Sequence, residues 1–199
     1  IRDLNPACTF IARPYYCPQP YSHTAVLSYM DTCIRDLEAL LEVVPAQHLW
    51  LKAFNEPNQP RNHPNWEGFG ADEEGMRQYN EAFLTVTGGV RNRLGHGPGI
   101  GFGSLAPGNR DVWFPGDPQG VHYYYHGPQA AKPSPTIQDL GNARQTCLCR
   151  DAIAAADAIF GHDYIHEAPD AWKQPWLGRR HEAMSRLYPD MPIFLVTSA

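Results

Sequence analysis

Short apolar runs alternate along the chain with longer runs in which apolar residues recur at every third or fourth position. The short runs are rich in β-branched and aromatic residues, which favours strands. They predict five strands, at residues 9–16, 48–55, 99–105, 157–164 and 193–197.

The longer runs predict amphipathic helices between these strands. One helix starts at Ser22 or Thr24 and ends at Pro45, and a second covers 72–94. The second begins with acidic residues and ends with basic ones, the charge order that suits the helix dipole. Further helices are expected at about 139–155 and in the segment that ends at Tyr188. The apolar face of the first helix comprises Val26, Tyr29, Met30, Cys33, Ile34, Leu37, Leu40, Leu41 and Val44.

The alternation of strands and helices predicts a parallel α/β fold in a single domain, residues 1–199. A doubly wound sheet would carry a glycine-rich phosphate loop after its first strand, and this chain has Pro14-Tyr15-Tyr16-Cys17-Pro18 there. Polar and aromatic residues follow the carboxyl end of each strand, where (β/α)8 barrel enzymes carry their sites. The expected fold class is therefore a partial (β/α)8 barrel, with no cofactor motif.

The composition argues against two classes of binding partner, nucleic acids and membranes. The 199 residues include 16 basic and 21 acidic ones, for a formal net charge of −5, without any basic run. A nucleic-acid partner is therefore not expected. No apolar run approaches the ~20 residues that a membrane-spanning helix needs, so no membrane partner is expected either.

Glycine, proline and cysteine add two expectations. The 17 glycines and 19 prolines predict long, shaped loops, of which the longest runs from Ala106 to about Thr136. The five cysteines are predicted to be buried or half-buried thiols. Cys147 and Cys149 form a C-x-C pair with no second pair to complete a zinc site.

Asn55-Glu56-Pro57 stands where the second predicted strand ends. A carboxylate fixed there, next to an amide that can bind a sugar hydroxyl, suits a general acid. The same three residue types also favour helix-capping turns. The motif by itself leaves both interpretations open.

Two further motifs occupy matching places. His162-Asp163-Tyr164 closes the fourth predicted strand, and Arg13 lies at the end of the first. With Phe54-Asn55-Glu56-Pro57-Asn58, this set resembles the retaining glycoside hydrolases of the large clan with (β/α)8 barrels. The resemblance covers nearly the whole chain, as strands three to seven of that barrel.

The resemblance implies specific roles. Glu56 would be the acid/base of O-glycosidic bond hydrolysis, and Asn55 would bind the 2-hydroxyl of the sugar. Arg13, His162 and Tyr164 would orient the substrate and the partner carboxylate. A carbohydrate is the implied substrate, and no metal or cofactor is implied.

The third motif departs from the family. Residues 192–199 look like the seventh strand, but Ser198 stands where the family has its nucleophilic glutamate. Retaining hydrolysis needs two carboxyls roughly 5–5.5 Å apart, and a serine without a base cannot replace one. A pseudoenzyme, an engineered nucleophile replacement and an alternative carboxylate such as Glu167 stay open. The Glu56 carboxyl and the Ser198 side chain are expected to face each other across a gap on the order of 5–8 Å.

Tryptophans recur in the loops expected at the carboxyl ends of the strands. Sugar rings stack their C–H faces on indole, so Trp172 and Trp176 are candidate substrate platforms, and Trp66 and Trp113 lie in comparable loops. For any one of them, packing in the protein interior is the alternative.

Other chemistries have less in their favour. His122 and His126, and likewise His162 and His166, show a spacing that pairs imidazoles on a helix. Neither pair lies in a predicted helix, and no G-x-S-x-G motif supports serine hydrolase chemistry. A metal-dependent barrel hydrolase is the weaker alternative, and a non-catalytic carbohydrate-binding or scaffold protein is the rival suggested by Ser198.

Five strands cannot close a barrel, and exposed parallel edges are a liability. The chain starts at Ile1 and ends directly after an apolar run, so we expect a domain that is incomplete at both ends. Its missing strands would lie in absent segments, come from a partner chain, or be replaced by irregular segments.

Overall fold

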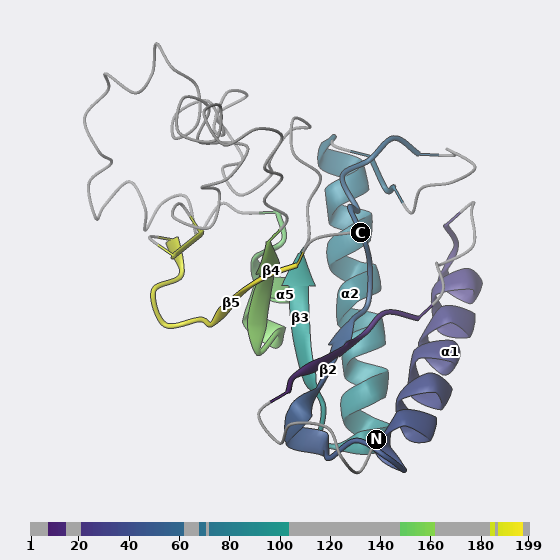
Figure 1. Cartoon of the computed structure of the whole chain (residues 1–199). Coiled ribbons are helices and arrows are strands. Elements are labelled where there is room, and N and C mark those ends of the chain that lie inside the picture. Colours follow the sequence, from purple (N-terminus) through teal and green to yellow (C-terminus); the bar gives the residue numbers. More distant parts are fainter. Residues whose placement is uncertain are drawn as a thin grey trace, which may run out of the picture.

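The computed structural model describes residues 8–14, 21–61, 68–70, 72–103, 148–161, 184–185 and 187–196. Their strands form one five-stranded sheet, and every neighbouring pair is parallel. The spatial order of the strands is their order along the chain (Figure 1). The strands are β1 (Phe10–Ala12), β2 (Leu49–Lys52), β3 (Gly99–Gly103), β4 (Ala158–Gly161) and β5 (Ile193–Leu195).

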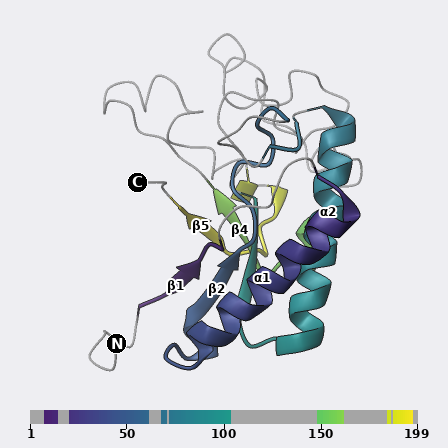
Figure 2. The same ribbon diagram turned by 90° about the vertical axis from the view of Figure 1, so that its right-hand side faces the viewer.

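Helices connect these parallel strands. α1 (His23–Leu41) follows β1, α2 (Glu73–Leu94) follows β2, and the short α5 (Arg150–Ala155) precedes β4. A 3-10 turn, η1 (Ala46–His48), leads into β2. Figure 2 shows α1 and α2 side by side over one face of the sheet. The chain is therefore an α/β protein, as its sequence pattern predicts.

Local chemistry fixes the ends of the two long helices. Ser22 and Asp72 are the N-caps, and their side-chain oxygens accept hydrogen bonds from the backbone N–H groups of Ala25 and Gly75. α2 ends at Gly95, which has a φ of +67°, a conformation that glycine adopts without a Cβ penalty.

The helix-facing side of the sheet is the hydrophobic core. Strand residues point alternately to the two faces, and those on this side are buried against α1, α2 and α5. The buried strand residues on this side are Leu49, Leu51, Ile100, Phe102 and Ile159. On α1 the buried residues are Val26, Tyr29, Cys33 and Leu37, which lie on the predicted apolar face.

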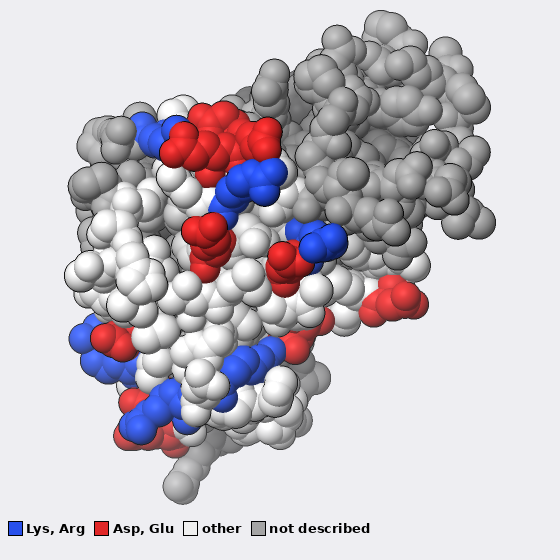
Figure 3. Space-filling model, turned by 180° about the vertical axis from the view of Figure 1, so that it is seen from behind, with Lys and Arg blue, Asp and Glu red and all other residues white. Residues whose placement is uncertain are grey.

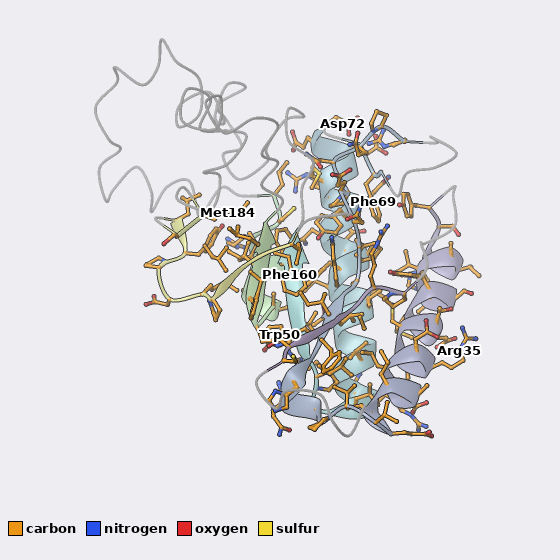
Figure 4. The ribbon with its side chains drawn as sticks, viewed as in Figure 1. Arg35, Trp50, Phe69, Asp72, Phe160 and Met184 are labelled. Carbon is orange, nitrogen blue, oxygen red and sulfur yellow. The ribbon has the colours of Figure 1, made fainter. Side chains whose placement is uncertain are left out.

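The opposite face of the sheet is concave and aromatic. The Trp50 ring on β2 lies 4.8 Å from the Phe194 ring on β5 and 6.3 Å from the Phe160 ring on β4, between centroids. β3 and β4 separate β2 from β5, so a flat sheet would hold these strands ~14 Å apart. The ring contact therefore requires strong curl. The five strands form a curled half-barrel, and Figure 4 labels Trp50 and Phe160 on its strands.

Glycines on β3 make room for these rings. A Cβ on Gly99 would lie 2.5 Å from a Trp50 ring carbon, and a Cβ on Gly101 would lie 2.4 Å from a Phe160 ring carbon. Both distances are far inside van der Waals contact. β3 thus contributes space, and its neighbours contribute the side chains that fill the concave face.

Several predicted boundaries need correction. β1 stops at Ala12, since Pro14 cannot donate to a ladder. β2 stops at Lys52, where the chain turns towards the helices and the Tyr29 hydroxyl donates to the Ala53 carbonyl. α1 ends at Leu41 and not at Pro45, because a proline four residues on cannot donate to the Leu41 carbonyl.

Predicted features in the later part of the chain are described only in part. Of the helix expected at 139–155, the structure describes a helix that begins at Arg150. Of the helix expected to end near Tyr188, residues 184–185 and 187 are described as helical. Cys33 and Cys149 are buried as predicted. Cys8 is exposed, which contradicts the expectation for it, because it precedes β1 outside the packed core.

The charged surface is mixed in sign. Figure 3 shows acidic and basic side chains interspersed over the face seen from behind. Several are paired, among them Arg77 with Glu73 and Arg93 with Glu38. Within the described part of the chain, no helix is long and apolar enough to cross a membrane.

Candidate active site

A tight turn carries the Asn-Glu-Pro motif, which begins three residues after the end of β2. The Gln59 N–H donates to the Glu56 carbonyl at 2.9 Å, which closes a turn over residues 56–59. Pro57 holds the second position of this turn, where its fixed φ is favourable. The turn therefore follows from the local sequence. It places Glu56 at the carboxyl end of a parallel strand.

Glu56 has an unusual backbone conformation. Its φ is +50°, and among the described residues it is the one non-glycine residue with a positive φ. A side chain there costs on the order of 1 kcal/mol relative to the right-handed region. Strain of this kind persists where the surroundings over-determine it, and it is concentrated at functional sites.

The half-buried Glu56 side chain receives a hydrogen bond from its own turn. The Gln59 side-chain amide donates from Nε2 to Glu56 Oε2 at 3.2 Å. The donor is a neutral amide, which does not itself neutralise a carboxylate.

A second segment straps the turn in place. The Phe69 N–H donates to the Pro57 carbonyl at 2.7 Å, and the Gly70 N–H donates to the Gln59 carbonyl at 2.9 Å. Gly68 approaches so closely that a Cβ there would lie 2.0 Å from the Gln59 carbonyl oxygen. We call residues 68–70 the strap. Its glycines allow two backbones to run in direct contact.

Arg61 joins the strap to the start of α2. Its Nε donates to the Phe69 carbonyl, and its guanidinium also donates to Asp72 Oδ1. That same Asp72 oxygen caps α2 by accepting from Gly75 N–H at 2.7 Å. Figure 4 shows Phe69 and Asp72 near the same end of α2. The turn, the strap and the helix therefore form one connected unit.

Aromatic rings form a rigid floor under this unit. Phe54, directly before the motif, lies 5.2 Å from Tyr29 and 5.6 Å from both Phe69 and Tyr79, between ring centroids. Phe69 in turn stacks on Tyr21 at 3.7 Å. Because large buried rings have few alternative packings, they fix the exit of β2 and with it Glu56.

Tyr79 extends the floor to the end of β3. Its hydroxyl accepts a hydrogen bond from the Gly103 N–H at 3.3 Å. Burial raises the pKa of the Tyr79 phenol well above its usual range, and the nearby Cys149 raises it further, while the Gly103 hydrogen bond opposes them. Tyr79 is therefore a neutral structural group.

Two cations lie near the carboxyl ends of β1 and β2. Lys52, the last residue of β2, is buried, and the exposed Arg13 follows β1 directly. The pairing of Ala12 with Leu51 puts them at the same level of the sheet. Asn55 is half-buried next to Glu56. The predicted residues Arg13, Asn55 and Glu56 thus all follow the carboxyl ends of adjacent strands.

Other predicted residues fall outside the part of the chain that the structure describes. They are Trp66, Trp113, His122, His126, Cys147, His162, Tyr164, His166, Glu167, Trp172, Trp176 and Ser198. Their convergence with Glu56 stays a prediction. Among the described residues, no group of three or more His, Cys, Asp or Glu side chains could hold a metal ion.

No protein-family model, curated protein or solved structure matches this chain. A function for it has to be inferred from its own residues. The turn after β2 is the described site that offers the clearest chemistry.

Sequence reasoning missed three residues of this site. Gln59, Phe69 and Arg61 bind or strap the turn, but none of them lies in the Asn-Glu-Pro motif. For Gln59 a signal exists, since a Pro-Asn turn brings residues three apart together. For Phe69 and Arg61 the contacts span eight or more residues, and no local pattern indicates them.

Proposed function

We propose that this chain is a glycosidase-like, carbohydrate-active protein of the retaining type, with Glu56 as its acid/base. One observation carries the proposal: Glu56 has a strained, left-handed backbone at the carboxyl end of a strand in a curled parallel sheet. A capping turn would need no such strain. The carboxyl ends of parallel barrel strands are where barrel enzymes place reacting groups.

The proposal includes a finer fold assignment. β1 to β5 would be strands three to seven of a (β/α)8 barrel, and further strands would complete it. The sequential order of the parallel strands and the curl of the sheet support this assignment, since both are properties of such a barrel.

The roles follow from the chemistry of retaining hydrolysis. Glu56 would protonate the leaving oxygen as the glycosidic bond breaks, and Asn55 would bind the 2-hydroxyl. Arg13, His162 and Tyr164 would orient the substrate and the partner carboxylate. Trp172 and Trp176 would stack on sugar rings. Ser198 takes the place of the second carboxylate, so we expect low turnover from the chain as it stands.

A panel of aryl glycosides tests the proposal. Wild type and Ser198→Glu are compared on glucosides, galactosides, mannosides and xylosides, and Glu56→Gln is then added to whichever is active. We expect Ser198→Glu to raise turnover and Glu56→Gln to abolish it. Glu81→Gln, an exposed carboxylate on α2, is the matched control and should change nothing. Activity that survives Glu56→Gln would contradict the assignment.

Ser198 also supports a second candidate, a non-catalytic carbohydrate-binding protein. Sugar binding by calorimetry, without turnover in either wild type or Ser198→Glu, is the outcome that favours it. The weaker metal-dependent alternative predicts that a chelator removes activity. Activity that a chelator leaves unchanged would exclude it.

A further inference from the structure

The Glu56 turn contains a glutamine whose backbone is fixed on both sides. The Gln59 N–H donates to the Glu56 carbonyl, and the Gln59 carbonyl accepts from Gly70 N–H, each at 2.9 Å. The Gly68 backbone presses against the same carbonyl. The backbone from which the Gln59 side chain extends therefore cannot rotate freely.

From this fixed backbone the Gln59 side chain reaches back to the carboxyl. Its Nε2 lies 3.2 Å from Glu56 Oε2, in a half-buried setting. An amide NH2 group is only a donor, so Glu56 Oε2 is the acceptor in this contact. The amide can donate to the carboxylate and to the carbonyl oxygen of the protonated carboxyl, so the contact persists in both forms.

We propose that Gln59 is a positioning residue that holds the Glu56 carboxyl through Oε2. In the step concerned, in the Ser198→Glu chain, a proton passes from the Glu56 carboxyl to the glycosidic oxygen while the carbon–oxygen bond to the leaving group breaks. The carboxylate at position 198 bonds to the anomeric carbon, and Glu56 is left as a carboxylate. The Gln59 contact is compatible with both forms and keeps the carboxyl plane fixed throughout. This inference rests on the proposed function of Glu56.

The same reasoning explains the strap. Residues 68–70 bind the backbone of the turn at Pro57 and Gln59, and not the Glu56 carboxyl itself. Their contribution to the acid is therefore indirect, through Gln59. A change in the Gln59 side chain leaves these backbone hydrogen bonds in place, so positioning can be tested separately from folding.

An alkylating sugar measures the position of the carboxyl without needing turnover. N-bromoacetyl glycosylamines of glucose, galactose, mannose and xylose are the probes. A Glu56 oxygen bonds to the bromoacetyl CH2 carbon, the carbon–bromine bond breaks, and bromide leaves. Peptide mass mapping identifies the esterified residue. The time course gives the inactivation constant kinact and the probe affinity KI for the full chain.

We expect the wild type to be esterified at Glu56. Gln59→Met, which keeps the length and loses the amide, should lower kinact by about tenfold or more, with KI within about twofold of wild type. Gln59→Asn keeps the amide but is one methylene short, and should behave like Gln59→Met. Gln78→Met is the matched control, because Gln78 donates to Glu74 at 3.1 Å on the exposed surface of α2, and it should leave both constants unchanged.

The outcomes separate the two claims. Esterification of Glu56 at the wild-type rate in both Gln59 variants overturns the inference and leaves the proposed function standing. A raised KI with an unchanged kinact, or loss of folding in both variants by circular dichroism, assigns Gln59 a structural role and also overturns it. If no probe esterifies Glu56 in the wild type, the proposed function fails and the inference falls with it.

Discussion

The two ends of the sheet both hold a carboxylate, and they hold it differently. At the amino end, Asp157 accepts hydrogen bonds from the Ile100 N–H, at 2.7 Å, and from the Arg91 guanidinium. Arg91 also donates to the Pro98 carbonyl at 3.1 Å. Here the ion pair between Arg91 and Asp157 links α2, β3 and β4, and neither residue has a positive φ. At the carboxyl end, Glu56 has a strained backbone and accepts from a neutral amide of its own turn.

This difference separates a structural carboxylate from a candidate reactive one. The Asp157 carboxylate is neutralised by the Arg91 guanidinium and accepts a hydrogen bond from the Ile100 N–H, so its charge stabilises the fold. Glu56 accepts a hydrogen bond from a neutral amide of its own turn, and its backbone conformation is unfavourable for stability. Substitutions at the two ends should therefore have opposite consequences.

The largest effect is expected at the amino end. Asp157→Ala removes the acceptor of the buried Ile100 N–H and leaves Arg91, whose side chain is 14% exposed, without its carboxylate. We expect the free energy of unfolding to fall by about 2–3 kcal/mol, measured by urea denaturation. Asp151→Ala, which breaks an exposed pair with Arg150, is the control and should cost less than about 0.5 kcal/mol. Equal effects of the two substitutions would remove the contrast between the ends.

Tyr79→Phe tests the floor beneath the carboxyl end. Loss of the hydroxyl leaves the buried Gly103 N–H without this acceptor, so we expect a loss of about 1–2 kcal/mol at neutral pH.

The pH dependence gives this prediction a sign. The pKa of Tyr79 is raised in the folded state, so above about pH 10 the unfolded chain releases a proton that the folded chain keeps. Wild-type stability should therefore fall as pH rises above this value, and Tyr79→Phe should show a shallower fall. An identical slope in the variant would show that Tyr79 ionises as readily in the folded chain.

A smaller effect is expected for Arg61→Met. The Arg61–Asp72 pair is largely exposed, with the Asp72 side chain 59% accessible, so global stability should fall by no more than about 1 kcal/mol. The local effect should be clearer, because hydrogen exchange at the Phe69 and Gly70 amides reports on the strap. We expect faster exchange there and no change at Ile100. Arg77→Met, which breaks an ion pair within α2, should leave the strap amides unchanged.

The smallest effect should have the opposite sign. Glu56→Gly relieves the left-handed strain and loses the Gln59 contact, so we expect a gain of about 0.5 kcal/mol. Glu56→Ala loses the same contact and keeps the strain, so it should be less stable than Glu56→Gly by about 1 kcal/mol. Thermal unfolding compares the two. A Gly variant no more stable than the Ala variant would show that the turn is not strained.

Much of the fold could be predicted from local pattern. The spacing of Val26, Tyr29, Cys33 and Leu37 indicates the buried face of α1, and all four are buried. All five predicted strands are present, although β1, β2 and β5 end earlier than expected. The end of a strand depends on where a neighbouring helix supplies the next hydrogen-bond partner, as α1 does when the Tyr29 hydroxyl donates to the Ala53 carbonyl. Such a contact between distant residues leaves no local signature.

For the candidate site, residue chemistry and geometry contribute separately. The Asn-Glu-Pro motif identifies Glu56, and the Pro57 turn is a local consequence of its residues. The left-handed φ of Glu56 is not, because Asn-Glu-Pro sequences also occur in ordinary capping turns. In this chain the strap binds the backbone directly after Glu56, at the Pro57 and Gln59 carbonyls, and the motif itself gives no sign of that contact.

The sequence by itself determined the element order, the parallel α/β class and the residue types after each strand, because periodicity and turn chemistry are local properties of the chain. Tertiary structure alone decided the curl of the sheet and the constraint on Glu56. The curl arises where Gly99 and Gly101 on β3 leave space for the Trp50 and Phe160 rings. The constraint arises where residues 68–70 pack on the turn. Both depend on contacts between segments distant in sequence, and a pattern along one segment carries no information about what will pack against it.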